Sequence, residues 1–117
     1  MALIRIKNLL VPAIIGFNPE ERLNRQDVLI NLIIEVEVSE AILTDNEESI
    51  YNYRTITKEV ISLVSESKFY LLEKLTHEVL QLIMRDMRVI WAKVEIDKPH
   101  ALRFSESVSV ELEAKRK

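Results

Sequence analysis

The chain has 117 residues, 48% of them hydrophobic, and its 16 basic and 19 acidic side chains give a net charge of −3. This length fits one domain spanning residues 1–117, and the apolar content is too high for a disordered chain. The slight acidic excess argues against a dedicated nucleic-acid binder, which needs a basic surface. Cysteine is absent and only two histidines occur, so one chain can build no disulfide, thiolate zinc site or three-histidine metal site.

The N-terminal sequence MALIRIKNLL alternates charged and apolar residues. It lacks the apolar stretch and the cleavage site of a signal peptide. No apolar run in the chain approaches the roughly 20 residues that a membrane helix needs. We therefore expect a soluble, cytoplasmic protein with no membrane partner.

The first third of the chain predicts two β-strands. Residues 26–38 alternate with period two, as a strand does, and residues 2–11 predict a partner strand. Residues 16–24 would form a long connection between them. This connection begins at the single glycine, Gly16. Glycine is used where φ is positive or where another group approaches the backbone closely. The apolar face of the second strand comprises Val28, Ile30, Leu32, Ile34, Val36 and Val38.

In the middle of the chain the hydrophobic period becomes helical. Residues 52–66 and 69–87 each place their apolar side chains on one stripe and leave a polar face opposite. The first stripe contains Ile56, Val60, Leu63 and Val64. The second contains Leu72, Leu75, Val79, Leu82 and Ile83. We expect two amphipathic helices that cover one face of a sheet.

Two further strands are predicted at residues 92–97 and 104–113, where apolar and polar side chains alternate again. The second would begin at Phe104 and place Val108, Val110 and Leu112 on the same face. The order strand, strand, helix, helix, strand, strand is typical of an α+β fold with a four-stranded antiparallel sheet. Both edges of such a sheet need protection, and pairing of subunits into a closed ring would provide it.

The turn DKPHALRFSESVS at residues 97–109 concentrates three cations, Lys98, His100 and Arg103. Lys98 is either a surface lysine at a hairpin or a cation that faces a developing negative charge. His77, by contrast, falls off the apolar stripe of its helix and is expected at the surface. Three cations in one turn suggest an anionic ligand such as a phosphate.

Three other side chains are candidates for chemistry. Glu73 near the start of the second helix is a solvated carboxylate favoured by the helix N-terminus, or an acceptor of two parallel hydrogen bonds from a flat amidine-like edge. Tyr53, next to Arg54, either packs at the entry to the first helix or stacks on a ligand and moves a proton. Glu21 lies in a charged run that reads most simply as a solvated loop. These patterns alone identify no reaction.

Together, several motifs resemble the dihydroneopterin aldolase family. They are IG at 15–16 with Glu21 five residues after the glycine, NYRTIT at 52–57, FYLLEKLTHEVL at 69–80 and DKPHALRFSESVS at 97–109. Each is weak alone, but the set runs in order through nearly the whole chain. Aldolases proper usually have lysine-proline-glycine in the turn, whereas here Pro99 is followed by His100 and Tyr53 by Arg54. Within the family, these two motifs are most similar to the branch that epimerises 7,8-dihydroneopterin triphosphate.

The resemblance implies the tunnelling fold, in which subunits join their sheets into a ring-shaped barrel. It also implies a homo-octamer of two stacked tetrameric rings, with active sites between neighbouring subunits. The implied activity is epimerisation at C2′ without a metal or cofactor. The alternative is aldol cleavage to 6-hydroxymethyl-7,8-dihydropterin and glycolaldehyde, as in folate biosynthesis. A non-catalytic, ring-forming pterin binder is a third possibility.

The resemblance further implies residue roles. Glu73 matches the anchor for the 2-amino group and N3 of the pterin, and the backbone of Leu72 helps to hold the same edge. Tyr53 matches a tyrosine that comes from the adjacent subunit and lies beside the pterin. Lys98 and Glu21 match the catalytic lysine and glutamate.

The remaining cations are candidates for binding the triphosphate tail. They are His100 and Arg103 in the turn, together with Arg54 at the start of the first helix. A tethered tail would retain the cleaved aldehyde and so favour epimerisation over release.

Overall fold

The computed structural model describes residues 1–99 and 101–117, with the backbone alone described at Ser49. His100, one of the predicted tail-binding residues, therefore lies outside the described residues. Within the described ranges, one antiparallel sheet has the strand order β1-β2-β3-β4. Its strands are β1 (Ala2–Ala13), β2 (Gln26–Val36), β3 (Val89–Pro99) and β4 (Ser107–Lys115).

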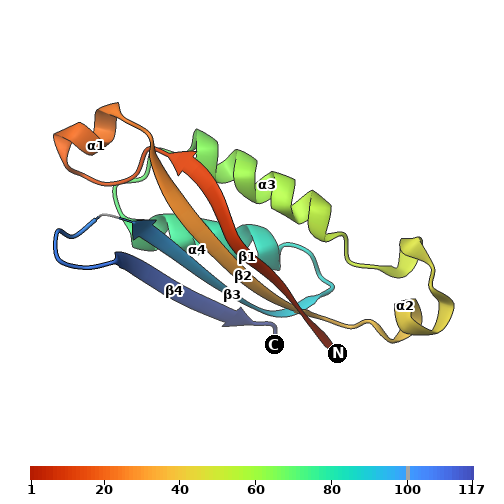
Figure 1. The fold of residues 1–117 in the computed structure, drawn as a ribbon. Helices are drawn as coiled ribbons and strands as arrows, with labels where there is room; N and C mark the ends of the chain where they lie inside the picture. Colours follow the sequence, from red (N-terminus) through yellow and green to blue (C-terminus); the bar gives the residue numbers. More distant parts are fainter. Residues whose placement is uncertain (100) are drawn as a thin grey trace.

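Two long helices, α3 (Tyr53–Glu66) and α4 (Leu72–Met84), lie on the same side of the sheet (Figure 1). Helix α3 packs against β1, and α4 packs against β3 and β4. The connections contain the short helices α1 (Pro19–Leu23) and α2 (Ser39–Thr44) and the 3-10 turn η1 (Glu47–Ser49). The predicted order of two strands, two helices and two strands is confirmed. None of the described helices is long and apolar enough to cross a membrane.

The core lies between the sheet and the two long helices. Alternate side chains of β2 and β3 are fully buried, as the period-two pattern predicts. The apolar stripes of α3 and α4 bury Ile56, Val60, Val64, Leu75, Val79 and Ile83 against them. Burial of each large aliphatic side chain stabilises the fold by roughly 1.5–3 kcal/mol, so the contact between the sheet layer and the helix layer contributes most to holding the fold together.

Some predicted boundaries were wrong. The strand predicted to reach Val38 ends at Val36, and Val38 instead precedes α2. The strand predicted to begin at Phe104 begins at Ser107, where Pro99 and Ser107 are the last paired residues of the β3–β4 hairpin. Phe104 therefore lies in the connecting turn and is 96% exposed. Its spacing from Val108 and Val110 would place it on the same face as these side chains, but no partner strand pairs with it to hold it on that face.

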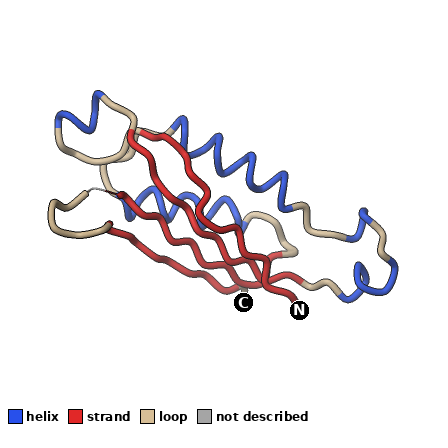
Figure 2. The backbone as a smooth tube through the Cα atoms, viewed as in Figure 1, coloured by secondary structure: helices blue, strands red, loops and turns tan. Residues whose placement is uncertain are grey.

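The molecule is elongated, with principal extents of 52 × 24 × 23 Å. Helix α1 and the β3–β4 connection lie at one end, and α2 lies at the opposite end (Figure 2). Helix α3 begins on the α2 side and ends on the α1 side. Residues at the two ends of α3 therefore belong to opposite ends of the molecule.

Candidate active site

A cavity of about 480 Å³ lies at the α1 end of the molecule. Its walls come from the α1 loop, the α3–α4 connection with the first turn of α4, and the facing ends of β3 and β4. Four of the predicted site residues line it, namely Glu21, Leu72, Glu73 and Lys98. The cavity also has an apolar side, to which Leu102, Val108 and Val110 contribute.

Lys98 and Glu21 form an ion pair in this cavity. Lys98 Nζ donates a hydrogen bond to Glu21 Oε2 over 2.7 Å, and the two side chains are only 14% and 28% exposed. The hydrogen bond from Lys98 lowers the pKa of Glu21, and a hydrogen bond from Gln26 lowers it further against the opposing effect of burial. Partial burial reduces solvent screening, so the carboxylate stays ionised beside the ammonium.

Several contacts hold the Glu21 carboxylate in place. Asn18 N donates to Glu21 Oε1 over 3.3 Å, which completes a capping box at the start of α1. Gln26 Nε2 donates to Glu21 Oε2 over 3.1 Å and to Ile15 O over 2.8 Å. Gly16 has φ +116, and a Cβ on it would overlap the Glu21 carboxylate. Glycine is therefore required at position 16 both for its backbone conformation and for the space that it leaves.

Glu73 and Leu72 occupy the first turn of α4. Leu72 is buried against the core, while Glu73 points outward and lines the cavity. Thr76 Oγ1 donates to Leu72 O over 2.8 Å inside the protein and fixes this turn. Within the described part of the chain, Leu71 supplies no side-chain cap to the helix N-terminus. The positive N-terminal end of α4 is thus part of the cavity wall that carries Glu73.

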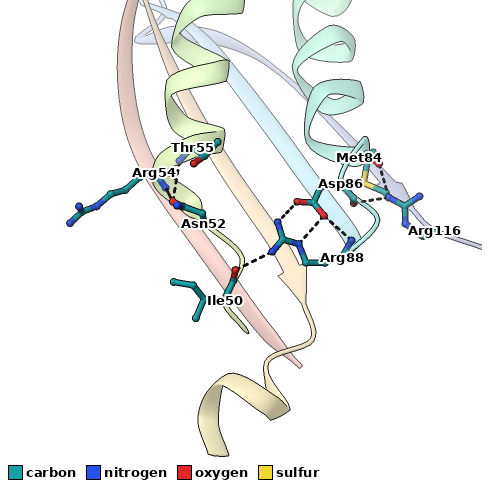
Figure 3. Close-up of polar contacts among 8 residues, drawn as sticks. All are labelled: Ile50, Asn52, Arg54, Thr55, Met84, Asp86, Arg88 and Arg116. Atoms are coloured by element: carbon teal, nitrogen blue, oxygen red, sulfur yellow. Dashed lines mark hydrogen bonds and ion pairs between the residues drawn. The ribbon is translucent and has the colours of Figure 1, made fainter. Parts of the chain in front are cut away.

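Tyr53 and Arg54 lie at the other end of the molecule. They begin α3, where Asn52 Oδ1 accepts hydrogen bonds from the backbone amides of Arg54 (3.0 Å) and Thr55 (3.2 Å) (Figure 3). Both line a separate surface hollow of about 420 Å³. A helix of 14 residues is about 21 Å long. Tyr53 is therefore too far from Lys98 to share a site with it inside one protomer.

The segment that leads into Tyr53 is fixed by a clamp that the sequence did not predict. Arg88 donates to both carboxylate oxygens of Asp86, and its Nη1 donates to Ile50 O over 3.0 Å (Figure 3). The hydrogen bonds from Arg88 lower the pKa of Asp86. Burial raises the pKa of the neighbouring Tyr51 to about 12. Among the described residues, the buried Tyr51 hydroxyl has no hydrogen-bond partner.

Lys98 and Arg103, two of the predicted cations in the turn, differ in their relation to the cavity. Arg103 is exposed in the β3–β4 turn, with its guanidinium carbon 5.6 Å from the Phe104 ring, and it does not line the cavity. Of the three cations in this turn, Lys98 lines the cavity and His100 is outside the description. His77 is exposed, as predicted. The described residues contain no cluster of three or more His, Asp or Glu side chains arranged for a metal ion.

Sequence reasoning missed Gln26 and Arg22. Gln26 pairs with Ala13 at the start of β2, and only this register brings its amide to Glu21. Arg22 lies within the run PEERLNRQD, where it looked like one more solvated charge. An arginine directly after a candidate catalytic glutamate was the available signal, but its partners lie 46 and 47 residues away.

A four-stranded antiparallel sheet with two long helices on one face, in the chain order of two strands, two helices and two strands, matches the tunnelling fold. A profile of the dihydroneopterin aldolase family matches residues 4–113. The chain belongs to this family, which confirms the resemblance carried by its motifs. The E. coli dihydroneopterin aldolase, solved in complex with neopterin, superposes with a TM-score of 0.92 at 24% identity, covering 97% of this chain and 99% of that one.

The most informative relatives by sequence are epimerases. The dihydroneopterin triphosphate 2'-epimerase of Pseudomonas aeruginosa is 51% identical over 99% of this chain and 94% of its own length. The enzyme of the same name from E. coli K12 is 45% identical over 98% and 96%. The dihydroneopterin aldolase of E. coli K12 is 25% identical over 97% and 93%.

Proposed function

We propose that this protein epimerises 7,8-dihydroneopterin triphosphate at C2′ to give dihydromonapterin triphosphate. The observation that carries the proposal is the difference in identity, 51% and 45% to two epimerases against 25% to an aldolase. The cavity supports it with the three side chains that the chemistry needs, Lys98, Glu21 and Glu73, on its walls.

Glu73 would anchor the pterin ring. Its carboxylate accepts two parallel hydrogen bonds, one from the 2-amino group and one from N3–H, while the backbone of Leu72 holds the same edge. The apolar side chains on the cavity wall would contact the flat ring. Neopterin and guanine carry the same aminopyrimidinone edge, and related structures are described as complexes with each.

Lys98 would stabilise the charge that develops when the bond between C1′ and C2′ breaks. This retro-aldol step leaves an electron pair on C1′, and the C6=N5 imine of the dihydropterin accepts it. An ammonium that donates to N5 stabilises the resulting negative charge in the transition state. Lys98 is suited to this role because its side chain is mostly shielded from solvent.

The 2′-hydroxyl must lose its proton in the same step. A water molecule held between Lys98 and Glu21 would act as the general base, with the ionised Glu21 carboxylate orienting it. The C2′ fragment then becomes an aldehyde. When the aldehyde turns over and adds back through its other face, C2′ is inverted. When C1′ is protonated instead, the aldehyde leaves, and the reaction is that of an aldolase.

Tyr53 would come from a neighbouring subunit and serve as the proton donor for C1′. Its position at the far end of α3 supports this assignment, because one protomer alone leaves the cavity without a tyrosine from this segment. We propose a ring in which the exposed edge of β1 pairs with the exposed edge of β4 in the next subunit, and in which the start of α3 with Tyr53 reaches the neighbouring cavity. Two such tetrameric rings would stack as a homo-octamer.

Arg103, His100 and Arg54 remain our candidates for the triphosphate tail. Arg103 supports this role, since it is exposed, follows Leu102 of the cavity lining in the sequence, and forms no salt bridge with the described carboxylates. A tail held there would retain the aldehyde. If the preference for triphosphorylated over unphosphorylated substrate were unchanged in Arg103→Ala, this assignment would be wrong.

Product chromatography tests the proposal. The protein is incubated with 7,8-dihydroneopterin and separately with its triphosphate. We expect the monapterin isomer of the triphosphate as the main product. Dominant 6-hydroxymethyl-7,8-dihydropterin would instead establish the alternative function, an aldolase of folate biosynthesis. A Lys98→Met variant that turns over at the wild-type rate would contradict the catalytic role of Lys98, whereas a wild-type protein that forms neither product would leave pterin binding alone.

A further inference from the structure

Two segments that are distant in the sequence form adjoining walls of the cavity. Residues 16–21 carry Glu21, and residues 70–73 carry Glu73. Arg22 lines neither wall, yet its guanidinium connects the two through hydrogen bonds to their backbones or to the residues directly before them. The proposed function gives no role to this side chain.

The guanidinium of Arg22 binds one backbone oxygen in the first segment and two directly before the second. Its Nη1 donates to Gly16 O over 3.0 Å and to Phe69 O over 3.2 Å, and its Nη2 donates to Lys68 O over 2.7 Å. Its central carbon lies 4.1 Å from the centroid of the Tyr70 ring. Gly16 N also donates to Phe69 O over 3.2 Å. The planar fork of arginine suits such a bridge, whereas a lysine ammonium is a single point of contact.

The two joined segments differ in how firmly the core holds them. Helix α1, which carries Glu21, has no buried residues. Helix α4, which carries Glu73, buries six: Leu72, Leu75, Thr76, Val79, Leu80 and Ile83. Polar contacts therefore hold α1 in place, while apolar packing holds α4. Loss of the Arg22 bridge would release the α1 side and leave the α4 side where it is.

We propose that Arg22 is a positioning residue that holds the α1 loop, and with it Glu21, against the fixed pterin-binding wall. It acts without touching the substrate. This inference rests on the proposed function for its kinetic consequence, namely that turnover depends on Arg22 while pterin binding does not. Its structural consequence, the anchoring of residues 16–24, holds independently of any activity.

Arg25 provides a matched control three residues later. Its Nη1 donates to Ser65 O over 2.6 Å and to Pro12 O over 3.4 Å. Like Arg22, it joins the region around α1 to a distant segment through backbone oxygens, here those of β1 and of the C-terminal end of α3. Unlike Arg22, it binds no residue of the cavity wall. Arg22→Gln and Arg25→Gln both remove hydrogen bonds from an arginine to backbone oxygens. Only Arg22→Gln removes a hydrogen bond to a residue that lines the cavity.

Hydrogen exchange measured by mass spectrometry tests the anchoring on the full-length protein. We expect faster exchange of the amides of residues 16–24 in Arg22→Gln than in Arg25→Gln, with unchanged exchange in α4. Equal exchange of residues 16–24 in the two variants would overturn the inference, whatever the wild-type protein catalyses. If Arg22→Gln does not fold, Arg22→Lys takes its place and the same comparison decides.

Kinetics test the consequence for turnover. Since small displacements of a catalytic group lower rates steeply, we expect kcat in Arg22→Gln to fall about 10-fold or more. The Kd for neopterin should stay within about 3-fold of wild type, because the Glu73 wall is intact. Arg25→Gln should retain the wild-type kcat. An unchanged kcat, or equal weakening of kcat and neopterin binding, contradicts the role. If the wild-type protein does not turn over the substrate, the proposed function is refuted instead. The anchoring role of Arg22 is then tested by hydrogen exchange alone.

Discussion

Lys98 Nζ and Glu21 Oε2 lie 2.7 Å apart although 77 positions separate the two residues in the sequence. One comes from the end of β3 and the other from a five-residue helix that buries nothing. The fold therefore has to deliver a cation and an anion to the same cavity from elements that the core holds to very different extents. Because α1 has no buried residues, Gly16, Gln26 and the capping box of α1 hold Glu21 in position instead of the core.

The pair should stabilise the protein at neutral pH and lose this effect at low pH. The folded-state pKa of Glu21 is lowered, mainly by the hydrogen bond from Lys98, so its contribution is complete above the unfolded value of about 4.3. It is lost as the pH falls through the lower, folded-state pKa. We expect Glu21→Gln to cost about 1 kcal/mol at pH 7 and progressively less below about pH 4. Denaturant titrations over a pH series measure this, and a constant difference between the two proteins would contradict it.

Gly16→Ala should damage both stability and activity. The positive φ alone costs about 1–3 kcal/mol for a residue with a Cβ, and the new methyl group also displaces the Glu21 carboxylate. We expect a lower free energy of unfolding and a kcat reduced about 10-fold or more. A double-mutant cycle with Glu21→Ala separates the two effects. Its coupling energy measures the overlap, and a coupling of zero would show that the backbone conformation is the only cause.

Glu73→Gln should weaken pterin binding. A charged acceptor of two hydrogen bonds is replaced by an amide with one acceptor atom, so the Kd for neopterin should rise about 10- to 100-fold. Glu78→Gln is the matched control on the same helix, because Glu78 pairs with Lys74 at 2.8 Å and does not line the cavity. Fluorescence titration with neopterin compares the two. Similar Kd values for neopterin in both variants would show that Glu73 does not bind the pterin.

Tyr51→Phe should leave the protein as stable as wild type or make it more stable. The Tyr51 hydroxyl is buried without a hydrogen-bond partner among the described residues, so its removal relieves a desolvation penalty of about 1–3 kcal/mol. Arg88→Gln should have the opposite effect, because it breaks the bonds to Asp86 and Ile50 that hold the start of α3. Thermal unfolding of the two variants tests this. A Tyr51→Phe variant that loses stability would indicate a bound partner for the hydroxyl.

Subunit mixing tests the shared site. Tyr53→Phe and Lys98→Met homo-oligomers should each form less of the 6-hydroxymethyl product, because this product needs both cleavage assisted by Lys98 and protonation of C1′ by Tyr53. After mixed refolding, some sites would combine an intact Tyr53 with an intact Lys98, so part of this cleavage activity should return. If mixing restores nothing although hybrid oligomers form, Tyr53 acts within its own protomer or not at all.

The sequence predicted the framework better than the supports of the site. Alternation in β2 and β3 and the stripes of α3 and α4 are properties of short segments, so their burial could be expected from spacing alone. Phe104 fitted the same parity but has no partner strand. Arg22 reaches partners 46 and 47 residues away, so its contacts depend on the route of the α3–α4 connection. The partners of Gln26 are nearer in the sequence, but the register of β1 and β2 places its amide beside them. No local pattern encodes such contacts.

The most direct measurement is the reaction of 7,8-dihydroneopterin triphosphate in D₂O, with the products separated and examined by mass spectrometry. Retro-aldol cleavage and re-addition never break the C2′–H bond. The account therefore predicts dihydromonapterin triphosphate as the main product, with no carbon-bound deuterium at C2′, and any 6-hydroxymethyl product with one deuterium at C1′. Deuterium at C2′ would contradict the mechanism, and dominant 6-hydroxymethyl-7,8-dihydropterin would contradict the epimerase function.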